Sequence, residues 1–96
     1  MSYTIYVTPT AVDDLSAAIE YYNAVSTDLG YRFADVVAQY FERIAAVPTA
    51  SAIRYKNVRC KPVSKFPFII TYTVDEKERA IQILRIFNTY QDPRRL

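Results

Sequence analysis

The spacing of the apolar residues changes near residue 50 of this chain, and this change limits the folds available to it. Before that point, after a short β-prone start, apolar residues recur every three or four positions, which is the repeat of an amphipathic helix. After it, stretches rich in β-branched and aromatic residues follow one another at short intervals, which is typical of strands joined by turns. The chain should therefore pack a helical layer on a sheet.

The helical part divides into two segments. Residues 9–25 carry one apolar stripe, and Pro9 suits the first position of a helix because no partner there needs its missing N–H. Thr8 can cap this helix, and residues 26–28 hold candidate caps for a second stripe that Pro48 ends. Because the connection is short, we expect an antiparallel helical hairpin.

The remaining segments are predicted as strands joined by short turns. They are residues 3–8, 54–63, 68–74 and 80–87. Pro62 cannot donate a hydrogen bond to a neighbouring strand, so its strand should lie at an edge of the sheet or end there. The predicted fold is one α+β domain, residues 1–96, in the order β-α-α-β-β-β, with the helical hairpin packed on one face of a mainly antiparallel four-stranded sheet.

Composition excludes several kinds of chemistry. The chain has no histidine and one cysteine, Cys60. It therefore lacks a histidine general base, a Ser-His-Asp or Cys-His pair, an internal disulfide and a multi-cysteine or imidazole metal site. We expect no cofactor and no metal. No stretch approaches the roughly 18 apolar residues of a membrane span, and no signal peptide is recognisable, so the cytoplasm is the expected location.

Charge is distributed unevenly, although the net charge is only +2. Residues 1–53 contain six acidic and two basic residues, whereas residues 54–74 contain five basic residues and no acid. Such asymmetry indicates an anionic partner, either nucleic acid or an acidic protein segment. We expect these cations to lie on the sheet face opposite the helices. The alternative is a solvated edge strand whose charges prevent aggregation.

One acidic residue, Asp14, and one basic residue, Arg85, lie within otherwise regular segments. Asp14 lies near the start of the first helix, where the helix dipole favours negative charge, and should face solvent. Arg85 interrupts the apolar strand 80–87. If Ile81, Ile83 and Phe87 share its face, this cation among hydrophobic residues predicts a partner-binding surface. If instead it contacts an acid such as Asp92, it forms a structural ion pair.

Three further segments, taken with the order of the elements, carry a family resemblance. They are AIEYYNAVSTDLGYRFADVV, RYKNVRCKPVSKFPFIITYTVDE and LRIFNTYQDPRR. Their most specific parts are Asp28-Leu29-Gly30 with Arg32-Phe33, the Phe66-Pro67-Phe68 turn, and the closing aromatic-x-x-x-x-Asp-Pro. Over nearly its whole length the chain resembles the RelE/ParE superfamily, the toxins of bacterial type II toxin–antitoxin (plasmid stabilisation type) operons.

The resemblance implies one of two activities. RelE-like toxins cut mRNA in the ribosomal A site with a cluster of Lys and Arg and, often, a Tyr or His near the C-terminus. ParE-like toxins trap DNA gyrase and have lost that cluster. In both branches the C-terminal segment of a cognate antitoxin wraps across the groove and sheet of the toxin, so a toxin–antitoxin hetero-oligomer is expected, without a membrane partner.

Most nuclease positions of the family are replaced in this chain. The catalytic arginine of the third strand corresponds to Ile69, a second arginine to Gln91 and a histidine to Asn88. Lys61, Tyr90 and, more loosely, Arg59 remain as counterparts.

These replacements favour the ParE-like branch: a toxin that binds an essential target such as DNA gyrase. A ribosome-dependent mRNA endoribonuclease using Lys61 and Tyr90 is one alternative, and a non-toxic remnant that only binds antitoxin is another. The residues expected to bind target or antitoxin are Arg59, Lys61, Lys65, Arg85, Asn88, Tyr90, Gln91 and Arg94.

Overall fold

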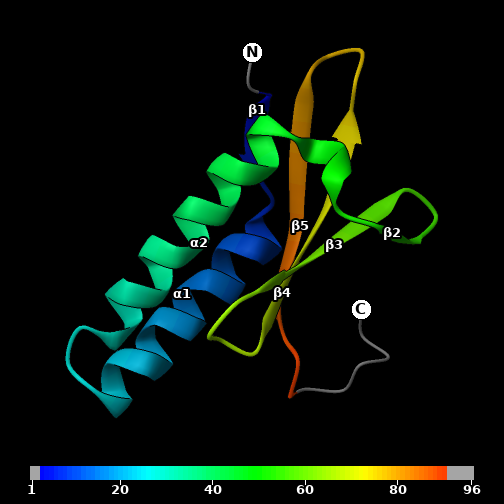
Figure 1. Cartoon of the computed structure of the whole chain (residues 1–96). Helices are drawn as coiled ribbons and strands as arrows, with labels where there is room; N and C mark the ends of the chain where they lie inside the picture. Colours follow the sequence, from blue (N-terminus) through cyan, green and yellow to red (C-terminus); the bar gives the residue numbers. More distant parts are fainter. Residues whose placement is uncertain (1–2, 91–96) are drawn as a thin grey trace.

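The computed structural model describes residues 3–90, in which a helical hairpin packs on one face of a five-stranded sheet (Figure 1). Its elements are β1 (Thr4–Val7), α1 (Pro9–Val25), α2 (Leu29–Ala46), the 3₁₀ turn η1 (Pro48–Ala50), β2 (Ile53–Tyr55), β3 (Val58–Val63), β4 (Phe68–Asp75) and β5 (Ala80–Asn88). The strand order is β1-β5-β4-β3-β2, with β1 parallel to β5 and the other pairs antiparallel. Within the described range, no helix is long and apolar enough to cross a membrane.

Thr8 begins α1 and also ties it to the sheet. Its hydroxyl oxygen accepts a hydrogen bond from the backbone N–H of Ala11 at 3.1 Å, which confirms the predicted cap. The same hydroxyl donates to the carbonyl of Leu84 in β5 at 2.9 Å. The helix therefore starts at a fixed point beside β5.

The start of α2 is stabilised by α1 rather than by a cap of its own. Asp28 precedes the helix with a left-handed φ of 70°, and its side chain makes no capping hydrogen bond. Instead, Oδ1 of Asn23 in α1 accepts the N–H of Gly30 at 2.7 Å. The turn of the hairpin is thus held by a contact between the two helices.

The sheet has one strand more than predicted. Residues 54–63 do not form one strand, because the chain turns at Lys56, whose φ is 50°, and folds β2 back antiparallel to β3. Pro62 lies beyond the residues that pair with β2, so β3 is an edge strand there. The predicted class, a helical hairpin on one face of a mainly antiparallel sheet, is confirmed.

A bulge in β5 changes which side chains face the helices. Ile81 and Ile83 pack in the core against the helices. The pairing with β4 then shifts at Leu84, and an extra residue in a strand reverses the faces of those that follow. Arg85 and Phe87 therefore start on the sheet face opposite Ile81 and Ile83, and the long side chain of Arg85 reaches back at the edge of β5 to Asp14 of α1. Of the neighbours expected beside Arg85, only Phe87 shares its face.

The core between the two layers is continuous. The hydroxyl of Tyr72 in β4 donates to the carbonyl of Pro48 at 2.8 Å and so fastens η1 to the sheet. The largest side chains of this core with almost no exposure are Tyr72, Phe33, Ile70, Ile81, Ile83, Ile86 and Val37, and Phe87 is equally buried on the other face of the sheet.

Candidate functional site

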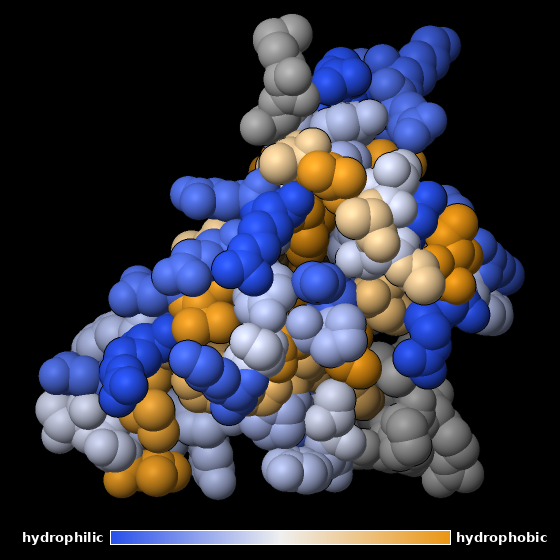
Figure 2. Space-filling model, viewed as in Figure 1, coloured by the Kyte–Doolittle hydropathy of each residue, from blue (hydrophilic) through white to orange (hydrophobic). Residues whose placement is uncertain are grey.

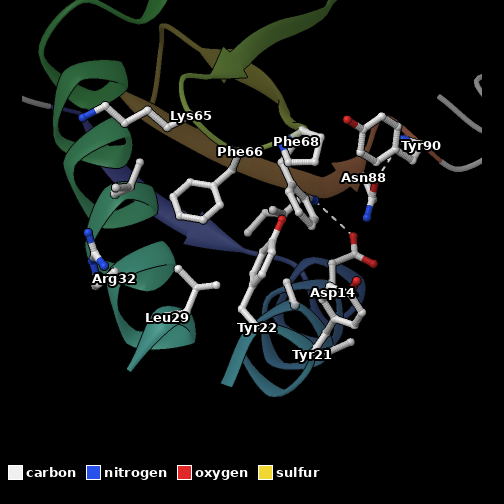
Figure 3. A pocket seen from close by; sticks show the side chains of 15 residues that line it. Asp14, Tyr21, Tyr22, Leu29, Arg32, Lys65, Phe66, Phe68, Asn88 and Tyr90 are labelled. Atoms are coloured by element: carbon white, nitrogen blue, oxygen red, sulfur yellow. Dashed lines mark hydrogen bonds between the residues drawn. The ribbon is translucent and has the colours of Figure 1, made fainter. Parts of the chain in front are cut away.

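An open cleft of about 1010 Å³ lies between the tip of the helical hairpin and one end of the sheet (Figure 3). Side chains of α1 and α2 form one side, and the β3–β4 turn and the end of β5 form the other. Three of the residues expected to bind a partner line it: Lys65, Asn88 and Tyr90. The fold therefore brings part of the predicted set together in one place.

Aromatic rings form the floor of the cleft. The Phe66-Pro67-Phe68 turn places two rings beside Tyr22 of α1, at 5.3 Å between the Tyr22 and Phe66 centroids and 6.1 Å for Phe68. Phe33 supports them from below, at 5.0 Å from Phe66 and 4.8 Å from Phe68. Burial raises the pKa of Tyr22 above its ordinary value, which favours the neutral hydroxyl.

The α2 side of the cleft is cationic. Arg32 projects from the first turns of α2, and Lys65 reaches toward that helix from the β3–β4 turn, where its φ is 73° (Figure 3). Both are exposed, and neither forms an ion pair with another residue in the 3–90 range. These charges are available to an anionic ligand.

The other end of the cleft is aromatic, and Asp14, which lines it there, is paired with Arg85. Tyr90 is 87% exposed, and its backbone N–H donates to Oδ1 of Asn88 at 2.8 Å. Tyr21 of α1 is also exposed on this side (Figure 3). The cleft thus combines an apolar floor, cations at one end and tyrosines at the other.

Arg85 forms a structural ion pair, but with Asp14 of α1. Its Nε and Nη2 donate to the carboxylate at 2.7 and 3.0 Å, and the backbone N–H of Ile86 donates to the same group at 3.1 Å. Strand β1 pairs with β5 only as far as Ile83. Beyond that point the Asp14 carboxylate accepts the backbone N–H of Ile86, which β1 does not reach. The hydrogen bond from Arg85 raises the pKa of its guanidinium. Asp14 was expected to face solvent and does not, and Asp92 lies outside the described residues.

Asp14→Asn should lower the free energy of unfolding by about 1.5 kcal/mol, because the amide loses the charge that strengthens three hydrogen bonds. Chemical denaturation measures the loss. Asp13→Asn is the matched control, since Asp13 is exposed and makes none of these contacts. Equal stability of the two variants would contradict a structural role for Asp14.

The predicted basic surface on the open sheet face is wrong. Arg59 pairs with Tyr72 and Lys61 with Ile70, and both partners belong to the core beneath the helices. Since directly paired residues share a face, both cations lie on the helix side. Nη1 of Arg59 donates to the carbonyl of Ser51 at 2.6 Å, so this residue fastens the segment after η1.

Lys61 of β3 and Arg43 of α2 form a second group of cations, around the ring of Tyr40. The Nζ of Lys61 lies 5.7 Å from the ring centroid of Tyr40, and the guanidinium of Arg43 lies 5.0 Å from the same ring. The backbone N–H of Ser64 donates to the Tyr40 hydroxyl at 2.9 Å. Hydrogen bonding by the side chain and backbone of Ser64 lowers the pKa of Tyr40, and the two cations act in the same direction.

Two residues of the candidate set, Gln91 and Arg94, lie outside the described residues. Arg32 and Arg43 were not among the residues expected to bind a partner. Their spacing of eleven residues is close to three helical turns, so both lie on one side of α2. That signal was present in the sequence, but which side faces β3 depends on the packing.

Comparisons with known proteins give a consistent result. Residues 5–93 match the family model described as the ParE toxin of the type II toxin–antitoxin system, parDE. A chain of the chromosomal ParDE toxin–antitoxin system from P. aeruginosa superposes with a TM-score of 0.78 at 21% identity, covering 91% of this chain and 96% of that one. A chain of the toxin–antitoxin complex RelBE2 from Mycobacterium tuberculosis gives a TM-score of 0.67 at 19% identity, covering 92% and 99%. No curated protein sequence matches significantly.

Proposed function

The chain belongs to the ParE toxin family of type II toxin–antitoxin systems, and from this membership we propose that it inhibits bacterial growth by binding DNA gyrase. The observation that carries the choice of target is the loss of nuclease chemistry. Ile69 stands where RelE-like toxins have a catalytic arginine, and an aliphatic side chain can neither donate to a phosphate nor stabilise its developing charge. Binding, rather than hydrolysis, is the activity that these residues can support.

We also propose that a cognate antitoxin neutralises the protein in the bacterial cytoplasm. Both structural relatives are described as toxin–antitoxin assemblies. The cleft supports the same conclusion, because its aromatic floor suits apolar side chains while Arg32 and Lys65 suit acidic ones. The resulting assembly is a hetero-oligomer of toxin and antitoxin.

The ribonuclease alternative depends on Lys61 and Tyr90. The ammonium of Lys61 lies over Tyr40 of α2, whereas Tyr90 lies at the far end of the cleft beside Asn88. Neither contacts the other in the described residues, and position 69 itself carries an aliphatic side chain. This arrangement favours gyrase binding over RNA cleavage.

Purified toxin is expected to inhibit supercoiling of a relaxed plasmid by DNA gyrase and to leave translating ribosomes without A-site cuts. Addition of the antitoxin encoded beside it should restore supercoiling. Full supercoiling at saturating toxin would overturn the proposed target. A-site cuts that disappear in Lys61→Ala or Tyr90→Ala would establish the ribonuclease, and normal growth on induced expression would identify a non-toxic remnant.

A further inference from the structure

We propose that the antitoxin docks along the junction of α2 and β3, with two acidic groups that meet two separate pairs of cations. One pair is Arg32 with Lys65, at the cleft, and the other is Arg43 with Lys61, beside Tyr40. We call these four residues the basic seam. The inference rests on the proposed neutralisation by an antitoxin and adds where, and with what chemistry, the antitoxin binds.

The helix sets the distance between the two pairs. Arg32 and Arg43 are eleven residues apart, which places them on one side of α2 and about 16 Å apart along its axis. Figure 2 shows a band of hydrophilic side chains that follows α2 on this side of the molecule. Arg43 and Lys61 do not line the cleft, so the seam continues beyond it.

The sheet contributes the other member of each pair. Lys61 lies within β3, on the helix side because it pairs with Ile70, and Lys65 follows in the turn that closes the cleft. The ring of Tyr40 projects from α2, and both the Arg43 guanidinium and the Lys61 ammonium of β3 lie within 6 Å of its centroid, at 5.0 and 5.7 Å. Each pair thus combines one cation from the helix and one from the sheet.

The charges of the seam are not neutralised within the part of the chain that the structure describes. The ion pair that the structure shows within residues 3–90 joins Arg85 to Asp14, and neither residue belongs to the seam. Arg59, by contrast, is held by the carbonyls of Thr49 and Ser51 and is not counted as part of the seam. An acidic ligand can therefore form ion pairs with both pairs of cations without breaking an ion pair that already exists within residues 3–90.

The surroundings favour an acidic peptide over a nucleic acid. Asp35 and Glu42 lie on the exposed side of α2 next to the cations and would repel a wide phosphate backbone. A peptide is narrow enough to follow the seam, and Val36 with the aromatic floor offers apolar contacts beside the first pair. If the antitoxin segment is extended, acidic residues about five positions apart reach both pairs of cations. If the segment is helical, the acidic residues must be about eleven positions apart.

The experiment measures the affinity of the toxin for the antitoxin encoded beside it. Arg43→Gln with Lys61→Gln should weaken binding about tenfold, and Arg32→Gln with Lys65→Gln by a similar factor. Because the pairs are far apart, the quadruple variant should lose about a hundredfold. Arg54→Gln with Lys77→Gln is the control, since it removes two exposed cations that lie outside the seam. Melting temperatures establish that every variant is folded.

The outcomes separate this inference from the proposed function. If the quadruple variant is folded and binds the antitoxin as tightly as wild type, the basic seam is not the docking site, although neutralisation by the antitoxin still stands. Wild-type toxin that binds no antitoxin overturns both. A fluorescein-labelled 20-base-pair DNA duplex serves as the second probe: if the seam variants lose affinity for DNA and keep their affinity for antitoxin, the seam is a nucleic-acid site and the inference is wrong.

Discussion

Gly30→Ala is expected to lower the free energy of unfolding by about 3 kcal/mol, although alanine is the better helix former by about 1 kcal/mol. A Cβ at this position would collide with the backbone carbonyl oxygen of Ile19 and with the side-chain amide of Asn23. The carbonyl belongs to α1 and cannot rotate away, so the two helices must separate. Their separation also weakens the bond that Asn23 accepts from the N–H of Gly30.

Urea denaturation, monitored by circular dichroism, measures this change in the free energy of unfolding. Tyr31→Ala is the control, because Tyr31 is the next residue in α2 and is 60% exposed. Asn23→Ala removes the hydrogen bond without adding an atom and should cost about 1 kcal/mol. If Gly30→Ala were as stable as wild type, the close approach of the helices would not be what requires glycine.

The helices were predictable because their signals are local. Thr8 and Pro9 mark the start of α1, and Pro48 stops α2, which ends at Ala46. The division of the following segment was not predictable, since it depends on Lys56 adopting a left-handed conformation. Lysine rarely does so, and no glycine or Asn-Gly pair indicates the turn.

The environment of Arg85 could not be predicted, because it depends on pairing between distant segments. The bulge at Leu84 turns Arg85 away from the face of Ile83. The partner Asp14 becomes available because β1 is too short to cover the edge of β5. Neither the bulge nor the length of that pairing is encoded in the periodicity of one strand.

The basic seam was only partly accessible from the sequence. The run of cations after residue 53 predicted a basic surface on the open face of the sheet, but the faces of Arg59 and Lys61 depend on the register of β3 against β4. That register places Arg59 and Lys61 above core residues, and it leaves Arg59 bound to backbone carbonyls. A count of charges cannot distinguish a cation that fastens a loop from one that is free to bind.

Phe33→Ala should have the largest effect, with a loss of about 4 kcal/mol, because it removes a fully buried ring and leaves a cavity. Phe33 is 0% exposed and contacts Tyr22, Phe66 and Phe68, at centroid distances of 5.4, 5.0 and 4.8 Å. A domain of this size is stable by about 5–15 kcal/mol, so much of the total is lost. Phe33→Leu, which keeps most of the volume, should cost only about 1.5 kcal/mol.

The same substitution tests whether the floor of the cleft depends on support from the core. Phe33 does not line the cleft, whereas the three rings that it supports do. At a temperature where Phe33→Ala remains folded, its affinity for the antitoxin should therefore fall, although no residue that touches the cleft has changed. Phe33→Leu should retain most of that affinity. If Phe33→Ala is destabilised but binds the antitoxin as tightly as wild type, the aromatic floor is not part of the interface.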